Sequence, residues 1–286
     1  MSAADEIVGD WAARGRRLDV AGAATTVWEE GSGDPVVCLH GVPSSSFLYR
    51  KVLPELAARG CRGIAFDLPG LGLAQRPRDF DYSWSGLGAW VVRAAGALAL
   101  DRFHLVVHDI GGPVGFDAVA RAPQQIASLT VLNTMVRVAS FRRPWSMEPF
   151  ARRGIGELYL RALHPLGFER LMRRQGVATD VPAAELRAYV PLLKRGDGGR
   201  AFLRIMRGFE LTQAFEQRTL RALAERAFPA QVLWGAQDPA LRIERHGEDV
   251  RQALAVDEIV RLPGKHFVQE DQPAAIAEHA ARIARP

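Results

Sequence analysis

An apolar run that ends in one acidic residue and two glycines constrains this chain more than any other feature. Residues 103–107 form the run, and Asp109 and the pair Gly111-Gly112 follow it. Such a run is typical of a strand buried on both faces, and the next helix is expected over residues 111–121. A strand that turns directly into a helix forms a strained elbow that lifts one side chain above the sheet. We therefore expect Asp109 at this elbow as a nucleophile, although an aspartate before a helix is more often only an N-cap.

Strand-like and helix-like segments alternate along most of the chain, which has the length of one large core or one core with an insertion. This alternation predicts an α/β fold whose mostly parallel central sheet is flanked by helices. Besides 103–107, strands are expected at residues 16–20, 24–29, 35–39, 62–66, 128–132, 230–234 and 258–262, and helices at 83–98, 111–121, 244–253 and from Pro273.

Residues 139–215, called the insertion below, interrupt this alternation after the sixth expected strand. They have helical periodicity over 150–163, 168–175, 183–193 and 199–209, and no convincing strand. Open α/β sheets bind ligands at the carboxyl ends of their strands, so an all-helical insertion is expected to form a lid there. The predicted organisation is a first core part (1–138), the lid (139–215) and a second core part (216–286).

The net charge of +5 comes from the insertion, which holds 14 basic and 7 acidic residues, whereas the rest of the chain has a small acidic excess. Arginines on the solvated faces of amphipathic helices are the ordinary explanation. The alternative is a basic rim that steers an anionic substrate. Because no basic stripe is interleaved with aromatic residues, we expect no nucleic-acid partner.

Several other classes of protein are excluded by composition. No apolar stretch is long enough to span a bilayer, and the acidic N-terminal segment has no apolar region typical of export, so we expect a cytoplasmic protein without a membrane partner. Cys38 and Cys61 lie in strand-like runs and are expected to be buried core residues. The histidines have no metal-ligand spacing, so neither a metal nor a cofactor is expected. The oligomeric state stays open.

Three further segments fit the plan of a hydrolytic site. The segment His40-Gly-Val-Pro follows a buried strand, and the backbone N–H of Val42, with that of Ile110, could form an oxyanion hole. Asp238 follows a late strand, and His266 follows the last one. The order nucleophile, acid, histidine is the one expected for a fold with such an elbow.

With these segments the chain resembles the α/β-hydrolase superfamily, specifically its Asp-nucleophile branch of haloalkane dehalogenases and epoxide hydrolases. The resemblance implies Asp109 as nucleophile, His266 as base and Asp238 as the acid that orients the base. Asn133 stands where some relatives have their acid. The segments that carry the resemblance are residues 40–50 (HGVPSSSFLYR), 67–72 (DLPGLG), 107–112 (VHDIGG) and 266–273 (HFVQEDQP).

An aspartate nucleophile restricts the substrate. A carboxylate ordinarily has a pKa near ~3.9 and needs no base to become ionised. Its attack on an acyl carbon would give a reactive anhydride, whereas its attack on a saturated carbon gives an ordinary ester, so the expected partners are a small apolar alkyl electrophile and water. His266 would then take a proton from the water that hydrolyses the ester of Asp109.

The leaving group distinguishes the two activities that the resemblance implies. Dehalogenases of the family typically hold the halide with a tryptophan after the nucleophile and a second donor, but the side chains of Ile110 and Val42 donate nothing. Trp145, the only tryptophan of the insertion, is a candidate substrate-binding residue but cannot complete the pair by itself. Epoxide hydrolases of the family protonate the alkoxide with lid tyrosines, and the insertion contains Tyr159 and Tyr189, although packing is an equal explanation for both. We therefore expect an epoxide hydrolase, with a haloalkane dehalogenase as the alternative and a non-catalytic small-ligand binder as the second alternative.

Overall fold

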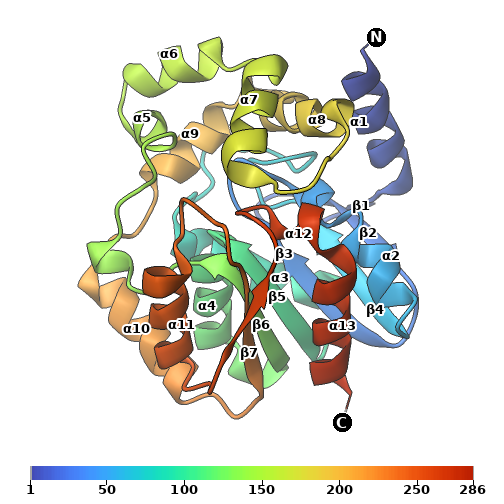
Figure 1. The fold of residues 1–286 in the computed structure, drawn as a ribbon, viewed down its shortest axis with the longest axis vertical. Helices are drawn as coiled ribbons and strands as arrows, with labels where there is room; N and C mark the ends of the chain where they lie inside the picture. Colours follow the sequence, from blue (N-terminus) through green and yellow to red (C-terminus); the bar gives the residue numbers. More distant parts are fainter. Residues whose placement is uncertain (1, 286) are drawn as a thin grey trace.

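A single eight-stranded sheet forms the centre of the computed structural model, which describes residues 2–285 (Figure 1). The strand order is β1-β2-β4-β3-β5-β6-β7-β8. β2 pairs antiparallel with β1 and β4, and all other neighbouring strands are parallel. The predicted α/β fold with a mostly parallel sheet is confirmed. The strands are β1 (Arg16–Leu18), β2 (Thr25–Glu30), β3 (Asp34–Leu39), β4 (Cys61–Phe66), β5 (Phe103–Asp109), β6 (Ile126–Thr134), β7 (Ala230–Gly235) and β8 (Ile259–Leu262).

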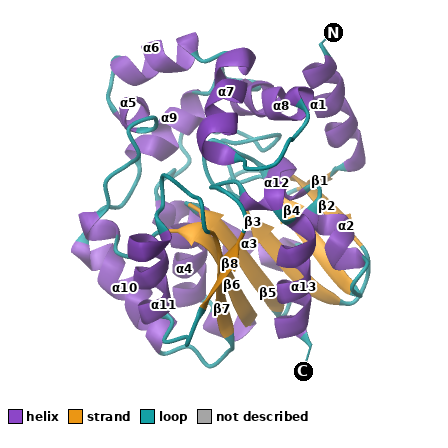
Figure 2. Ribbon diagram, viewed as in Figure 1, coloured by secondary structure: helices purple, strands orange, loops and turns teal. Residues whose placement is uncertain are grey.

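Helices cover both faces of the sheet, which explains the continuous apolar runs of its strands (Figure 2). In β3, Val37 and Leu39 belong to the core beneath α3, α4, α10 and α11, whereas Val36 and Cys38 belong to the core beneath α2 and α13. Both cysteines are buried and neither forms a disulfide. The bounds of these helices are α2 (Val52–Ala57), α3 (Trp84–Ala97), α4 (Gly111–Arg121), α10 (Gln213–Ala224), α11 (Glu248–Ala253) and α13 (Pro273–Ala284).

The insertion lies over the carboxyl ends of the parallel strands as a layer of helices (Figure 1). Within its described residues the chain forms helices and loops but no strand. Its last helix, α10, begins inside the insertion and then packs against α4 in the core. The other helices of the insertion are α5 (Glu148–Ala151), α6 (Ile155–Ala162), α7 (Pro165–Leu171), α8 (Ala183–Lys194) and α9 (Arg200–Arg207).

One local expectation is wrong, and one helix was not expected. The helix predicted over 150–163 is divided into α5 and α6, because Gly154 adopts a φ of 80° and its N–H donates to the side chain of Glu157 instead of continuing the first helix. The structure also contains a helix that periodicity did not indicate, α1 (Ala3–Arg14), which begins with a capping box between Ser2 and Asp5. Among the described residues, none of the helices has the length and apolar character needed to span a membrane.

Candidate active site

Asp109 ends β5 and occupies a strained turn into α4. Its φ of 52° lies in the left-handed region, which costs a non-glycine residue on the order of 1–2 kcal/mol. The hydroxyl of Thr134 donates to the backbone carbonyl of Asp109 and helps to hold this conformation. Gly112 permits the close approach, because a Cβ at that position would lie 2.0 Å from Thr134 Oγ1. The residue thus has the elbow geometry expected from the sequence.

One backbone donor already contacts the carboxylate of Asp109. The N–H of Val42 donates to Asp109 Oδ1 over 2.8 Å. The loop carrying Val42 can pass this close only because Gly41 has no side chain: a Cβ there would lie 2.2 Å from the same oxygen. No hydrogen bond of the described chain joins the N–H of Ile110 to the carboxylate. The first predicted oxyanion donor therefore faces Asp109, and Ile110 stays a prediction.

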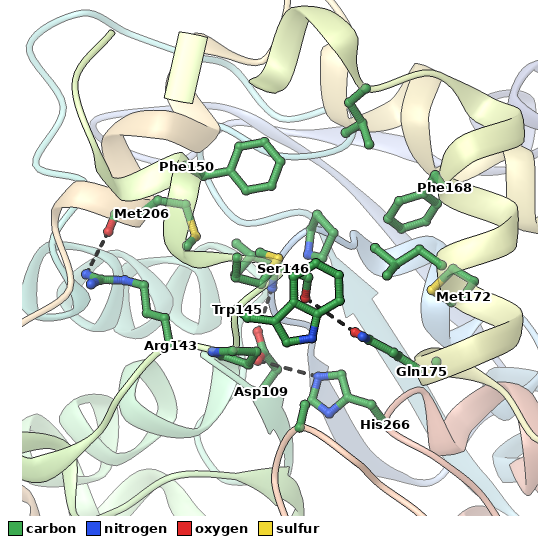
Figure 3. A pocket seen from close by; sticks show the side chains of 18 of the residues that line it. Asp109, Arg143, Trp145, Ser146, Phe150, Phe168, Met172, Gln175, Met206 and His266 are labelled. Carbon is green, nitrogen blue, oxygen red and sulfur yellow. Dashed lines mark hydrogen bonds and ion pairs between the residues drawn. The ribbon is translucent and has the colours of Figure 1, made fainter. Parts of the chain in front are cut away.

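His266 lies between the carboxylates of Asp109 and Asp238, and Figure 3 shows its contact with Asp109. Its Nδ1 donates to Asp238 Oδ2 over 2.8 Å, and its Nε2 lies 3.6 Å from Asp109 Oδ2. Asp238 follows β7, and His266 follows β8, so the carboxyl ends of three parallel strands bring the three side chains together. The structure thus assembles the three residues that the sequence singled out for catalysis.

The charges of this group shift the pKa values of its members. Burial disfavours the imidazolium of His266, but the nearby carboxylates, first Asp238 and then Asp109, outweigh it and raise the pKa of His266 to about 10. Burial likewise favours the neutral acid at Asp238, yet the charge of His266 and several hydrogen bonds lower the pKa of Asp238. Esterification of Asp109 would remove one of the two charges that hold the proton on His266.

Two further residues, Asn133 and His108, fix this arrangement through hydrogen bonds. Asn133 Nδ2 donates to Asp238 Oδ2, and its Oδ1 accepts from the N–H of Gly235, each over 2.8 Å. His108 Nε2 donates to the backbone carbonyl of His266 over 2.8 Å, and burial lowers the pKa of His108 to about 3, so it stays neutral. The sequence signals for Asn133 were its position directly after a buried strand and its place where some relatives have their acid.

A pocket of about 370 Å³ lies above Asp109 and His266, between the core and the insertion. Apolar side chains form most of its wall, among them Phe150, Phe168 and Met206 (Figure 3). The insertion also contributes groups with a polar atom: Arg143, Trp145, Ser146, Tyr159, His164 and Gln175. Two of the three predicted insertion residues, Trp145 and Tyr159, therefore line the pocket. No cluster of residues that could bind a metal ion occurs within residues 2–285.

Tyr189 is not at the pocket, and the prediction that it contacts substrate is wrong. Its side chain is buried, and its hydroxyl donates to Glu270. Its ring packs edge-on against Phe47 and Phe267, because α8 turns this face toward the core of the protein. Periodicity indicated the helix but could not indicate which neighbour this face would meet.

The comparisons with known proteins agree with this geometry. Residues 34–273 match a family model described as alpha/beta hydrolase fold. The chain belongs to the α/β-hydrolase family. This hydrolase is 31% identical over 259 residues to a haloalkane dehalogenase of Mycobacterium marinum, an alignment that covers 87% of this chain and 85% of the relative.

Solved structures share the fold of this hydrolase at lower identity. Cfl2 of Burkholderia cenocepacia superposes with a TM-score of 0.81 at 22% identity, covering 95% of both chains. A proposed epoxide hydrolase of Pseudomonas aeruginosa gives a TM-score of 0.78 at 22% identity, covering 95% of this chain and 97% of the other. The chain is thus an enzyme of the hydrolase group that contains dehalogenases and epoxide hydrolases.

Proposed function

We propose that this hydrolase converts an apolar epoxide into a vicinal diol through an ester of Asp109. The observation that carries the proposal is the carboxylate of Asp109 at the floor of an apolar pocket, with Nε2 of His266 3.6 Å from its free oxygen. Oδ1 is held by Val42, so Oδ2 is the oxygen available to attack a saturated carbon. The carbon–oxygen bond of the epoxide breaks, and the alkoxide takes a proton from an acid in the insertion.

The second half of the reaction is hydrolysis of that ester. Once Asp109 is esterified it carries no charge, and the pKa of His266 falls because one of its two carboxylate partners is neutralised. His266 can then accept a proton from water, which attacks the carbonyl carbon of the ester. The N–H of Val42 stabilises the oxyanion and Asp238 holds the imidazole. As the ester bond breaks, the leaving oxygen takes the proton back from His266 and the diol is released. The carboxyl group of Asp109 then loses its proton, which restores the acid of the insertion through water.

The side chains around the nucleophile favour an epoxide over an alkyl halide. Ile110 and Val42 flank Asp109 and have no side-chain donor for a departing halide. Tyr159 lines the pocket and has a hydroxyl that can protonate an alkoxide. With Tyr189 buried elsewhere, Tyr159 is the one tyrosine of the insertion left for this role, and His164 at the same wall is a second donor.

A haloalkane dehalogenase is the second candidate, and one observation favours it. The indole of Trp145 lines the pocket and could donate its N–H to a halide. The dehalogenase of Mycobacterium marinum is also a relative over most of both chains. In this reaction Asp109 forms the same ester, but the carbon–halogen bond breaks and no proton is needed for the leaving group.

Intact-protein mass spectrometry of His266→Gln separates these candidates. Without the base the ester should persist, so an aryl epoxide should add its whole mass to the protein, whereas a bromoalkane should add its alkyl group with loss of bromide. We expect the epoxide adduct, mapped to Asp109, and none in His266→Gln/Asp109→Asn. His279→Gln, on α13 away from the pocket, is the matched control and should turn over normally. A persistent adduct from bromoalkanes alone would favour the dehalogenase, and tight binding without any adduct would favour a non-catalytic binder.

A further inference from the structure

We propose that the outer surface of the insertion docks onto membranes that contain anionic lipids, with the mouth of the pocket next to the bilayer. The first observation is a concentration of apolar side chains. All the exposed large hydrophobic residues among residues 2–285 lie between positions 145 and 166. We call them the apolar patch: Trp145, Ile155, Leu158, Tyr159 and Leu166, with exposed fractions of 41–66%.

Helix α6 supplies the centre of the apolar patch. Ile155, Leu158, Tyr159 and Ala162 are spaced as one continuous face of a helix, and all four are exposed. The opposite face is apolar as well, since Leu160 is buried inside the insertion. A helix in a water-soluble surface layer ordinarily has a polar outer face. α6 lies at the outer edge of the molecule (Figure 1), and this face stays exposed although the ring of Tyr159 packs edge-on against Phe150.

The charge around the apolar patch is positive and uncompensated. The three acidic residues between positions 139 and 176 are each paired with arginines: Glu148 with Arg143 and Arg152, Glu157 with Arg207, and Glu169 with Arg173 and Arg187. The exposed arginines of this segment that form no ion pair within the described residues are Arg142, Arg153, Arg161, Arg170 and Arg174.

These two features together specify the partner. Exposed apolar side chains on a short helix, flanked by unpaired arginines, are the pattern of a helix that lies in the interface of an anionic bilayer. A second copy of this chain fits poorly, because a symmetric contact through this surface would place two positively charged surfaces against each other, and the acidic residues between positions 139 and 176 are already paired. This proposal departs from the expectation of no membrane partner, which rested on the lack of a stretch long enough to span a bilayer; surface docking requires no such stretch.

The position of the pocket indicates what the docking would do for the enzyme. Trp145 and Tyr159 belong both to the apolar patch and to the wall of the pocket. The patch is therefore continuous with the mouth of the pocket. An apolar epoxide of the kind proposed above concentrates in lipid, so docking would bring the mouth to the phase that holds the substrate. This last step rests on the proposed function, but the docking itself does not.

Co-sedimentation with vesicles tests the proposal on the full-length protein. We expect binding to vesicles of phosphatidylcholine with about one-third phosphatidylglycerol, weaker binding at high salt, and little binding to phosphatidylcholine alone. Arg153→Gln/Arg161→Gln should bind about tenfold or more weakly, and Ile155→Ser/Leu158→Ser should also lose binding. Arg102→Gln/Arg221→Gln removes the same charge outside the insertion, from two exposed arginines without ion pairs, and should bind as the wild type does.

Two results would overturn the proposal. One is that the wild type does not bind the anionic vesicles, or that the variants of the insertion bind them as strongly as the control variant Arg102→Gln/Arg221→Gln does. The other is a concentration-dependent dimer, seen by light scattering, that the Ile155→Ser/Leu158→Ser variant abolishes, because the apolar patch would then be an interface between copies. Turnover of a water-soluble substrate by every variant verifies that each is folded, and loss of vesicle binding with intact turnover separates this proposal from the proposed function.

Discussion

At the scale of single residues, the site depends on how two carboxylates share one imidazole. Asp238 is held by hydrogen bonds from Asn133 and from the backbone of Ala240 and Leu241, so it keeps its charge and its orientation throughout. Asp109 has the Val42 N–H on one oxygen and the imidazole of His266 near the other. Of the two carboxylates, only Asp109 changes its charge during the proposed reaction. This change lowers the pKa of His266, so that the imidazolium can lose its proton and the imidazole can act as a base.

We predict that Asp109→Asn lowers the pKa of His266 from about 10 toward its ordinary value, because the substitution imitates the loss of charge on esterification. Titration of the imidazole by NMR measures this shift, and Asp19→Asn, which removes an exposed and distant charge, should not alter it. If the pKa of His266 is the same in Asp109→Asn as in the wild type, the proposed activation of the base by esterification is wrong.

The raised pKa of His266 also determines how its contribution to the free energy of unfolding depends on pH. A histidine with a folded-state pKa near 10 and an unfolded pKa of about 6.5 stabilises the fold fully below pH ~6.5. That stabilisation declines as the pH rises toward 10. The loss of unfolding free energy caused by His266→Gln should therefore shrink over this interval.

The sequence predicted the central residues because their chemistry is tied to strand ends. Asp109, Asp238 and His266 each follow an apolar run, and parallel strands bring such positions to one edge. Tyr189 was misassigned because helical spacing does not show what a helix face contacts. Asn133 and His108 act through hydrogen bonds across the sheet, which depend on strand order and register, and no single sequence shows either.

At the scale of elements, the loop that carries His266 is attached to the insertion. Phe267 N–H donates to the carbonyl of Gly176, and the ammonium of Lys265 donates to the carbonyl of Arg173, each over 2.8 Å. The carboxylate of Asp271 accepts from the N–H groups of Lys265, Ala178 and Thr179. The buried carboxylate of Asp271 thus connects the loop that carries His266 to the insertion.

We predict that Asp271→Ala slows hydrolysis of the ester more than its formation. Losing these bonds should let His266 drift, and a displacement of about 1 Å can cost on the order of 100-fold in rate. Rapid-quench mass spectrometry should then show the ester accumulating, with its formation rate within a few-fold of wild type. Asp180→Ala, a 98% exposed acid in the same part of the insertion, is the control. Equal slowing of both steps would mean that Asp271 supports the fold rather than the base.

The elements themselves were predictable to different degrees. The strands β3 to β7 coincide with apolar runs, which are typical of a sheet covered by helices on both faces. Their positions agree with the expected ones within a few residues. The break between α5 and α6 was missed because Gly154 and the polar residues around it also fit a helical period. Its positive φ accompanies a hydrogen bond from its N–H to the side chain of Glu157, which periodicity does not show.

At the scale of the whole molecule, the core carries Asp109, Asp238 and His266, and the insertion forms much of the pocket wall above them. The core follows from alternating strands and helices, which leave few topologies open. The insertion carries the surplus of arginine, and its acidic residues near the pocket mouth are all paired. The size of that surplus follows from the composition, but only the folded chain distinguishes paired from unpaired arginines. It is this distinction that favours an anionic surface as partner.

The most direct test of the central claim follows oxygen through one turnover. With enzyme in excess over epoxide in heavy-oxygen water, attack of water on the ester carbonyl should leave the diol unlabelled. The peptide that contains Asp109 should gain one heavy oxygen, and mass spectrometry detects both. Heavy oxygen in the diol of this first turnover, with none in Asp109, would mean that water attacks the substrate directly, and the account of a covalent aspartyl ester would be contradicted.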